Sequence, residues 1–171
     1  MRSRSNVTWF STKVRYQKTM EDGSEKVVTE NYLVDALSFT EAESAITDEM
    51  SVYVSGEFQV SGIAKAAYNE VFFSDVDDDD KWYKAKLQFI TLDDKTEKEK
   101  RSTVNYLVQA KSLARALRYV DEEMGKTMID YDTIGLNETN LMDVFEHQAP
   151  NKEEKNDVPE YEQGNAEQPA E

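Results

Sequence analysis

Apolar and polar residues alternate along the first part of the chain in the way that predicts β-strands. Residues 8–19 and 26–36 each alternate with a period of two, and Asp22-Gly23 between them is a hairpin turn signal. In the second segment the apolar residues that share one face are Val28, Tyr32, Val34 and Ala36. We therefore expect a pair of antiparallel strands at the beginning of the fold.

A helix is predicted directly after this hairpin. Ser38 and Glu41 match a capping box, in which the two side chains satisfy free N–H groups at a helix start. The apolar residues that follow recur at helical spacing: Phe39, Ala42, Ile46 and Met50. Residues 56–61 and 67–73 are predicted as two further short strands, so the unit is ββαβ(β).

The same order of elements occurs a second time in the chain. Trp9-Phe10-Ser11-Thr12-Lys13-Val14-Arg15-Tyr16 aligns with Trp82-Tyr83-Lys84-Ala85-Lys86-Leu87-Gln88-Phe89, and Tyr32-Leu33-Val34-Asp35-Ala36-Leu37-Ser38 aligns with Tyr106-Leu107-Val108-Gln109-Ala110-Lys111-Ser112. Order, spacing and residue class agree throughout, which indicates an internal repeat. The second copy is predicted to have strands at 82–92, 101–110, 129–134 and 139–145 and a helix at 112–124. That helix has the apolar face Leu113, Ala116, Val120 and Met124, and Arg115 replaces the acid of the capping box.

These patterns predict an α+β fold that is internally duplicated, with antiparallel sheets and one helix per repeat. Residues 1–148 would form a single domain, in which repeat 8–74 and repeat 81–147 are related by a pseudo-two-fold axis. Pairing the copies would bury the two helices or join the two sheets, because a single copy has open sheet edges. Residues 149–171 hold all three prolines and few large apolar side chains, so we expect a disordered acidic tail.

Composition narrows the class of protein further. The chain has no cysteine, which excludes disulfides, thiolate metal sites and cysteine nucleophiles. The net charge of −15 argues against binding duplex nucleic acid through the whole surface. The N-terminus lacks the apolar segment of a signal peptide, and no apolar run is long enough to span a bilayer, so a cytoplasmic location is expected.

The sequence gives little support for a catalytic or metal-binding site. The one histidine, His147, lies at the edge of the tail and is expected to be solvated, and no nucleotide-binding or hydrolase motif is present. The run Asp75-Val76-Asp77-Asp78-Asp79-Asp80 could bind Ca²⁺ or Mg²⁺, but it lacks the glycine and the terminal glutamate of an EF-hand. A solvated linker between the repeats is the favoured interpretation. We therefore expect a non-enzymatic protein without cofactor or metal.

The first strand of each repeat carries the strongest candidate for a binding site. With a period of two, each strand presents one tryptophan and two cations on the face opposite its apolar side. Tryptophan can stack on a base and cations can contact phosphates, which is how single-strand binders work. The predicted nucleic-acid-binding residues are Trp9, Lys13, Arg15, Trp82, Lys84 and Lys86.

Other interpretations of the same residues remain open. Tryptophan at a strand start often folds into the core, and exposed Lys and Arg on a strand also protect against aggregation. The leading hypothesis is an accessory protein that binds single-stranded DNA or RNA. The alternatives are a module in which the acidic linker and tail bind a basic protein or act as an inhibitor, and an oligomeric virion-assembly component.

The repeated blocks also resemble a known group of proteins. The residues concerned are Trp9 to Tyr16, Tyr32 to Ala42, Gly56-Glu57-Phe58 and Lys81-Trp82-Tyr83-Lys84. They resemble a family of short proteins of unknown function found in Bacteroides-type bacteria and their phages, over about residues 8–147. The resemblance implies no established activity. It suggests phage or mobile-element DNA metabolism, or virion assembly, as a setting.

Overall fold

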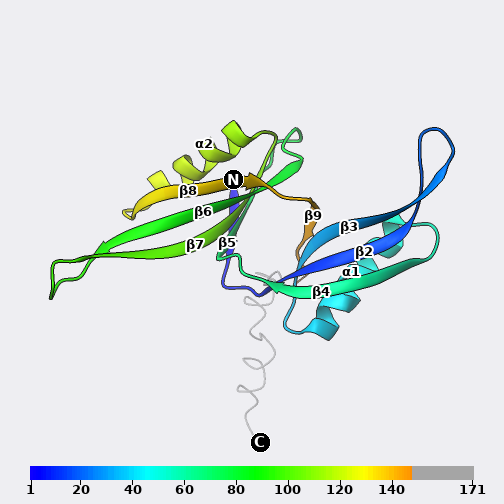
Figure 1. Cartoon of the computed structure of the whole chain (residues 1–171), viewed down its shortest axis with the longest axis horizontal. Coiled ribbons are helices and arrows are strands. Elements are labelled where there is room, and N and C mark those ends of the chain that lie inside the picture. Colours follow the sequence, from blue (N-terminus) through cyan, green and yellow to red (C-terminus); the bar gives the residue numbers. More distant parts are fainter. Residues whose placement is uncertain (148–171) are drawn as a thin grey trace, which may run out of the picture.

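The computed structural model describes residues 1–147 and contains two β-sheets, each with one helix on one face (Figure 1). The first half has β1 (Arg2–Ser5), β2 (Trp9–Thr19), β3 (Glu25–Asp35), α1 (Phe39–Tyr53), β4 (Phe58–Ala66) and β5 (Glu70–Phe73). The second half has β6 (Lys81–Leu92), β7 (Glu99–Ala110), α2 (Leu113–Gly125), β8 (Asp130–Glu138) and β9 (Leu141–Phe145). The α+β class is thus as predicted, and the predicted disordered tail lies outside the described residues.

The two halves exchange their last strands. The five-stranded sheet has the order β1-β5-β7-β6-β8, and the four-stranded sheet has the order β4-β2-β3-β9. Strand β5 pairs in parallel with β7, and β9 pairs in parallel with β3. The prediction of antiparallel sheets is therefore wrong, since both sheets are mixed. Alternation along a strand reports its buried face but not its neighbour, and these two short strands cross to the other half.

The pairing of the exchanged strands is the same in both sheets. Leu33 lies opposite Val144 in one sheet, and Leu107 lies opposite Val71 in the other. A bulge follows Lys13 in the pairing of β2 with β4, and another follows Lys86 in the pairing of β6 with β8. Positions that align in the sequence thus have the same neighbours in the structure.

Each helix covers an apolar sheet face, as the alternation predicts. On the first sheet Phe10 and Val14 pack with residues of α1, and on the second Leu87 packs with residues of α2. The buried helix residues are Ala42, Ala45, Ile46 and Met50 in α1, and Ala116, Val120 and Met124 in α2. Phe39 and Leu113 belong to the predicted helix faces but remain about half exposed, at 50% and 51%.

A third core joins the two halves on the sheet faces that the helices leave uncovered. It contains Trp9, Leu33, Val71, Trp82, Leu107 and Val144, all of which are buried. The exchanged strands β5 and β9 each contribute one valine to it. Strand exchange and this shared core thus connect the two halves.

Strand β1 was not predicted, and an ion pair holds it in place. Arg4 lies 2.8 Å from Asp35 at the end of β3 and 2.8 Å from Glu146 just after β9. The Asp35 side chain is fully buried and that of Arg4 is 8% exposed. The two ends of the described chain are thus fixed to the same point of the fold. None of the helices in residues 1–147 is long and apolar enough to cross a membrane.

Candidate functional site

The two tryptophans of the predicted nucleic-acid site are buried. Trp9 is 1% exposed and Trp82 is 2% exposed, and both lie in the core between the halves. The Trp82 ring also packs edge-on against Phe73, with ring centroids 5.5 Å apart. Neither indole can stack on a base, so this part of the prediction is wrong. The period of two correctly places each tryptophan on the strand face opposite the helix. It does not show that the other half of the protein covers this face at the start of the strand.

The predicted cations, in contrast, are exposed. Lys13 and Arg15 lie further along β2, beyond the shared core, and Lys84 and Lys86 lie on β6. In the alignment of the two strands Lys13 matches Lys86, whereas Arg15 matches Gln88 and Lys84 matches Ser11. Opposite Lys13 lies Gly62, and opposite Lys86 lies Gly135. These cations are thus accessible to a ligand, whereas the two tryptophans are part of the core between the halves.

One residue of the acidic run has a structural role that the linker interpretation missed. Asp79 is 2% exposed, and its carboxylate accepts hydrogen bonds from the Ser74 and Tyr119 hydroxyls, the Lys111 backbone N–H and the Arg115 guanidinium. Burial by itself would raise the pKa of Asp79, but these hydrogen bonds hold it below its usual range. The remaining acids of the run, Asp75, Asp77, Asp78 and Asp80, are not buried.

His147 is exposed, as predicted, but its ring has an acidic neighbour. Its Nε2 lies 3.0 Å from the Glu49 carboxylate at the end of α1, and its backbone N–H donates to Asp35. Across residues 1–147, no group of three or more His, Asp and Glu side chains is placed to hold a metal ion.

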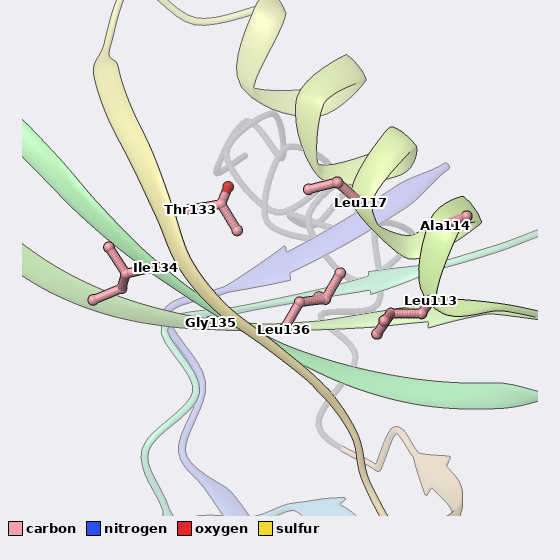
Figure 2. A pocket seen from close by; sticks show the side chains of 7 residues that line it. All are labelled: Leu113, Ala114, Leu117, Thr133, Ile134, Gly135 and Leu136. Atoms are coloured by element: carbon pink, nitrogen blue, oxygen red, sulfur yellow. The ribbon is translucent and has the colours of Figure 1, made fainter.

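An apolar groove lies between α2 and β8. It has a volume of about 580 Å³ and is lined by Leu113, Ala114, Leu117, Thr133, Ile134, Gly135 and Leu136. Figure 2 shows Leu117 and Thr133 pointing toward each other from the helix and the strand, while Ile134 points away on the far side of β8. Leu113, Leu117 and Ile134 are each between 41% and 51% exposed. The side chains between helix and strand form the groove itself, and Ile134 lies at its rim.

Strand β8 forms one wall of this groove and is the outermost strand of its sheet. On one side it pairs with β6, and on the other side no strand of residues 1–147 pairs with it. The backbone N–H and C=O groups on that outer side can accept an additional strand. A free strand edge beside an apolar groove is the arrangement by which some domains bind an extended peptide as an extra strand.

The corresponding surface of the first half is more polar. Aligned positions place Glu43 where α2 has Leu117, Thr40 where it has Ala114, and Ser61 where β8 has Ile134. Deeper in the groove the difference is reversed, because Thr133 replaces Val60. The Thr133 Oγ1 is buried and has no hydrogen-bond partner among the described residues. At Leu117 and Ile134 the second half thus has exposed apolar side chains where the first half has polar ones.

The sequence contains the residues of this groove but does not show that they lie together. Helical spacing predicts Leu113 on the buried face of the helix, whereas the structure leaves it 51% exposed. Only the structure shows that Leu113 and Leu117 lie beside the edge strand rather than beneath the helix. Comparing the two repeats position by position, with Glu43 against Leu117, is the sequence signal that points to it.

The architecture defines an α+β protein in which two sheet-and-helix halves exchange strands, with an apolar groove on one of them. Residues 8–147 match the family model described as Domain of unknown function (DUF4494), and the chain belongs to this family. No curated protein matches the chain, and no solved structure matches it.

Proposed function

We propose that this chain is a protein-interaction module that binds an extended segment of a partner in the groove between α2 and β8. The observation that carries the proposal is the coincidence of exposed leucines with a free strand edge. Apolar side chains of the partner would occupy the groove beside Leu113 and Leu117, and its backbone would pair with β8. A partner in this position would remove from water the exposed apolar surface that the fold leaves uncovered.

We further infer that the two halves arose by duplication of one ββαββ unit and are related by a pseudo-two-fold axis. The matched strand pairing, the matched bulges after Lys13 and Lys86, and the aligned sequences support this inference. Two copies of one unit are then free to differ in their surfaces. The first half keeps Glu43 and Ser61, and the second half has Leu117 and Ile134 at those positions, which fits a binding role confined to the second half.

A displayed library of random peptides tests the proposal without a known partner. The wild-type chain would be used for selection beside the Leu117→Glu variant, which places in the groove the residue that the first half has there. We expect peptides that the wild type enriches to lose binding to Leu117→Glu and to keep binding to Glu43→Gln, the matched change in α1. Enriched peptides that bind Leu117→Glu equally well would overturn the groove as the binding site.

Binding of single-stranded nucleic acid stays a second candidate, supported by the exposed cations of β2 and β6, of which Lys13 and Lys86 occupy matching positions. Without an accessible tryptophan, such binding would rest on phosphate contacts by Lys13, Arg15, Lys84 and Lys86. It would therefore weaken steeply with salt and show little preference for a base. Anisotropy of labelled oligo-dT at low salt tests it. The double variant Lys84→Glu/Lys86→Glu should weaken binding if the candidate is correct, and Leu117→Glu should not.

A further inference from the structure

The charges on β8 indicate the chemistry of the segment that would bind there. Strand β8 carries Asp130, Asp132 and Glu138 and has no cation. At the positions that align with Asp132 and Glu138, β4 has Gln59 and Lys65, and β4 contains no acid. At the position of Asp130 the first half has Glu57, directly before β4, so the two halves share an acid there and differ at Asp132 and Glu138. Of these acids, Asp132 pairs with Arg101 and Glu138 lies 3.8 Å from Lys81, whereas Asp130 has no ion pair among residues 1–147.

Asp130 and Asp132 lie on the face of the strand opposite the groove, whereas Glu138, which pairs with Tyr83 beyond the bulge, lies on the helix side. Tyr131 and Thr133 lie on the helix side, where the Tyr131 hydroxyl donates to Asp121 and Thr133 lines the groove. Asp130 and Asp132 alternate with them and therefore lie on the other face. Along residues 130–133 an added strand would therefore meet the helix side with every second side chain and the carboxylates of Asp130 and Asp132 with the side chains between.

The same charges argue against a second copy of this chain as the occupant. If two β8 strands paired with each other, the three acids of each would meet a strand that has no cation. Like charges directly opposite each other destabilise a strand pair. The segment 149–171 of the chain has the same difficulty, because it is itself acidic and would bring further carboxylates to the edge.

Resting on the proposed function, we infer that the groove is specific for an extended segment of a partner protein in which aliphatic residues alternate with Lys or Arg. The aliphatic side chains enter the space between α2 and β8. The cations lie on the other face of the sheet, within reach of Asp130 and Asp132. The acidic net charge of the chain, −15, favours the approach of such a segment at long range.

Synthetic peptides of about eight residues, the length of an average strand or slightly more, test this inference by fluorescence anisotropy. The first alternates Lys with Val and Ile, the second has Glu in place of Lys, and the third has the composition of the first with all lysines at one end. A fourth repeats the first with N-methyl groups on alternate backbone nitrogens, which prevents pairing with a strand edge.

We expect only the first peptide to bind well, with affinity that falls as salt is added. Leu117→Glu and Asp130→Asn should each weaken it, the former about tenfold or more. The matched changes in the first half, Glu43→Gln and Glu57→Gln, should have no effect.

Two outcomes would overturn the inference and are distinguishable. Equal binding of the lysine and glutamate peptides, still lost in Leu117→Glu, would refute the charge preference and leave the groove as a docking site. Binding of the lysine peptide that is unchanged in Leu117→Glu and in the N-methyl peptide would show that simple charge attraction is responsible. That second result would refute the inference. The proposed function would still be tested by the library selection, which does not depend on peptide charge.

Discussion

The guanidinium of Arg115 donates a hydrogen bond of 3.2 Å to the buried carboxylate of Asp79. This pair stands at the start of α2, where α1 has a capping glutamate. In α1, Glu41 accepts a hydrogen bond from the Leu37 backbone N–H at 2.9 Å. The aligned acceptor position in α2 is Arg115, and the aligned N–H, that of Lys111, donates to Asp79 instead, also at 2.9 Å. The carboxylate that caps α2 thus comes from the acidic run between the halves.

Asp79→Asn should destabilise the fold by roughly 2–3 kcal/mol, because a charged acceptor of four hydrogen bonds becomes a neutral amide. Unfolding in urea, followed by tryptophan emission, measures the change. Asp78→Asn is the matched control and should cost less than about 0.5 kcal/mol, since surface substitutions seldom exceed that. An equal effect of the two changes would contradict the capping role of Asp79.

The pKa shifts of Asp79 and Glu146 predict how stability depends on acid. Burial alone would raise the pKa of Glu146, but its hydrogen bonds with Arg2 and Arg4 hold it below its usual value, as the partners of Asp79 do for that carboxyl. Both pKa values are lower in the folded state than in the unfolded chain, so both groups stabilise the fold above about pH 4, and this contribution is lost as the pH falls further. The fall in stability below about pH 4 should be smaller in Asp79→Asn than in the wild type.

Arg4→Met should cost about 3–5 kcal/mol, because it leaves the fully buried Asp35 carboxylate without its cation. Arg2, which also pairs with Glu146 but is 61% exposed, provides the control. Arg2→Met should cost less than about 1 kcal/mol. The account of the terminal ion pair fails if both variants unfold at the same urea concentration.

Trp9→Ala should lower the free energy of unfolding by about 3–5 kcal/mol, since it opens a cavity in the core between the halves.

Acrylamide should quench the emission of the wild-type tryptophans weakly, and adding oligo-dT should not change this quenching. Strong quenching of either indole by acrylamide, or a change on adding oligo-dT, would contradict their burial.

Glu30→Gln should lower the pKa of Tyr16. Burial and the hydrogen bond to the Glu30 carboxylate raise the pKa of Tyr16 to about 12. Since the folded state holds this proton more tightly than the unfolded chain, stability should decline between about pH 10 and pH 12. An alkaline absorbance titration of Glu30→Gln, compared with Glu30→Gln/Tyr16→Phe, isolates this phenol. A Tyr16 pKa that stays near 12 without the carboxylate would refute the assignment.

Local patterns in the sequence were enough to place most elements and both helix-side cores. The period of two assigned Phe10 and Val14 to the face beneath α1, and helical spacing assigned Ile46 and Met50 to the face that meets them. These assignments depend on neighbours close in sequence, where alternation and spacing are informative. Strand β1 was missed because Arg2–Ser5 contains no apolar residue, so no hydrophobic alternation marks it.

Long-range features could not be predicted in the same way. The burial of Trp9 and Trp82 depends on the exchange of β5 and β9, and alternation along a strand does not identify the strand beside it. The capping role of Asp79 likewise depends on a contact with Arg115, 36 residues away. The groove depends on the position of β8 at the edge of its sheet, which the sequence does not show. Beside that free edge, the replacement of Glu43 by Leu117 at the aligned position indicates a binding groove.

The binding of a partner along β8 is tested most directly by amide hydrogen exchange of the wild-type chain with and without the peptide that alternates Lys with Val and Ile. We predict slower exchange in residues 130–138 of β8 when the peptide is present, because its backbone pairs with the free edge. Residues 58–66 of β4, the free edge of the first half, should exchange at an unchanged rate. Protection that appears in β4, or none in β8 at a peptide concentration that saturates binding, would contradict the account.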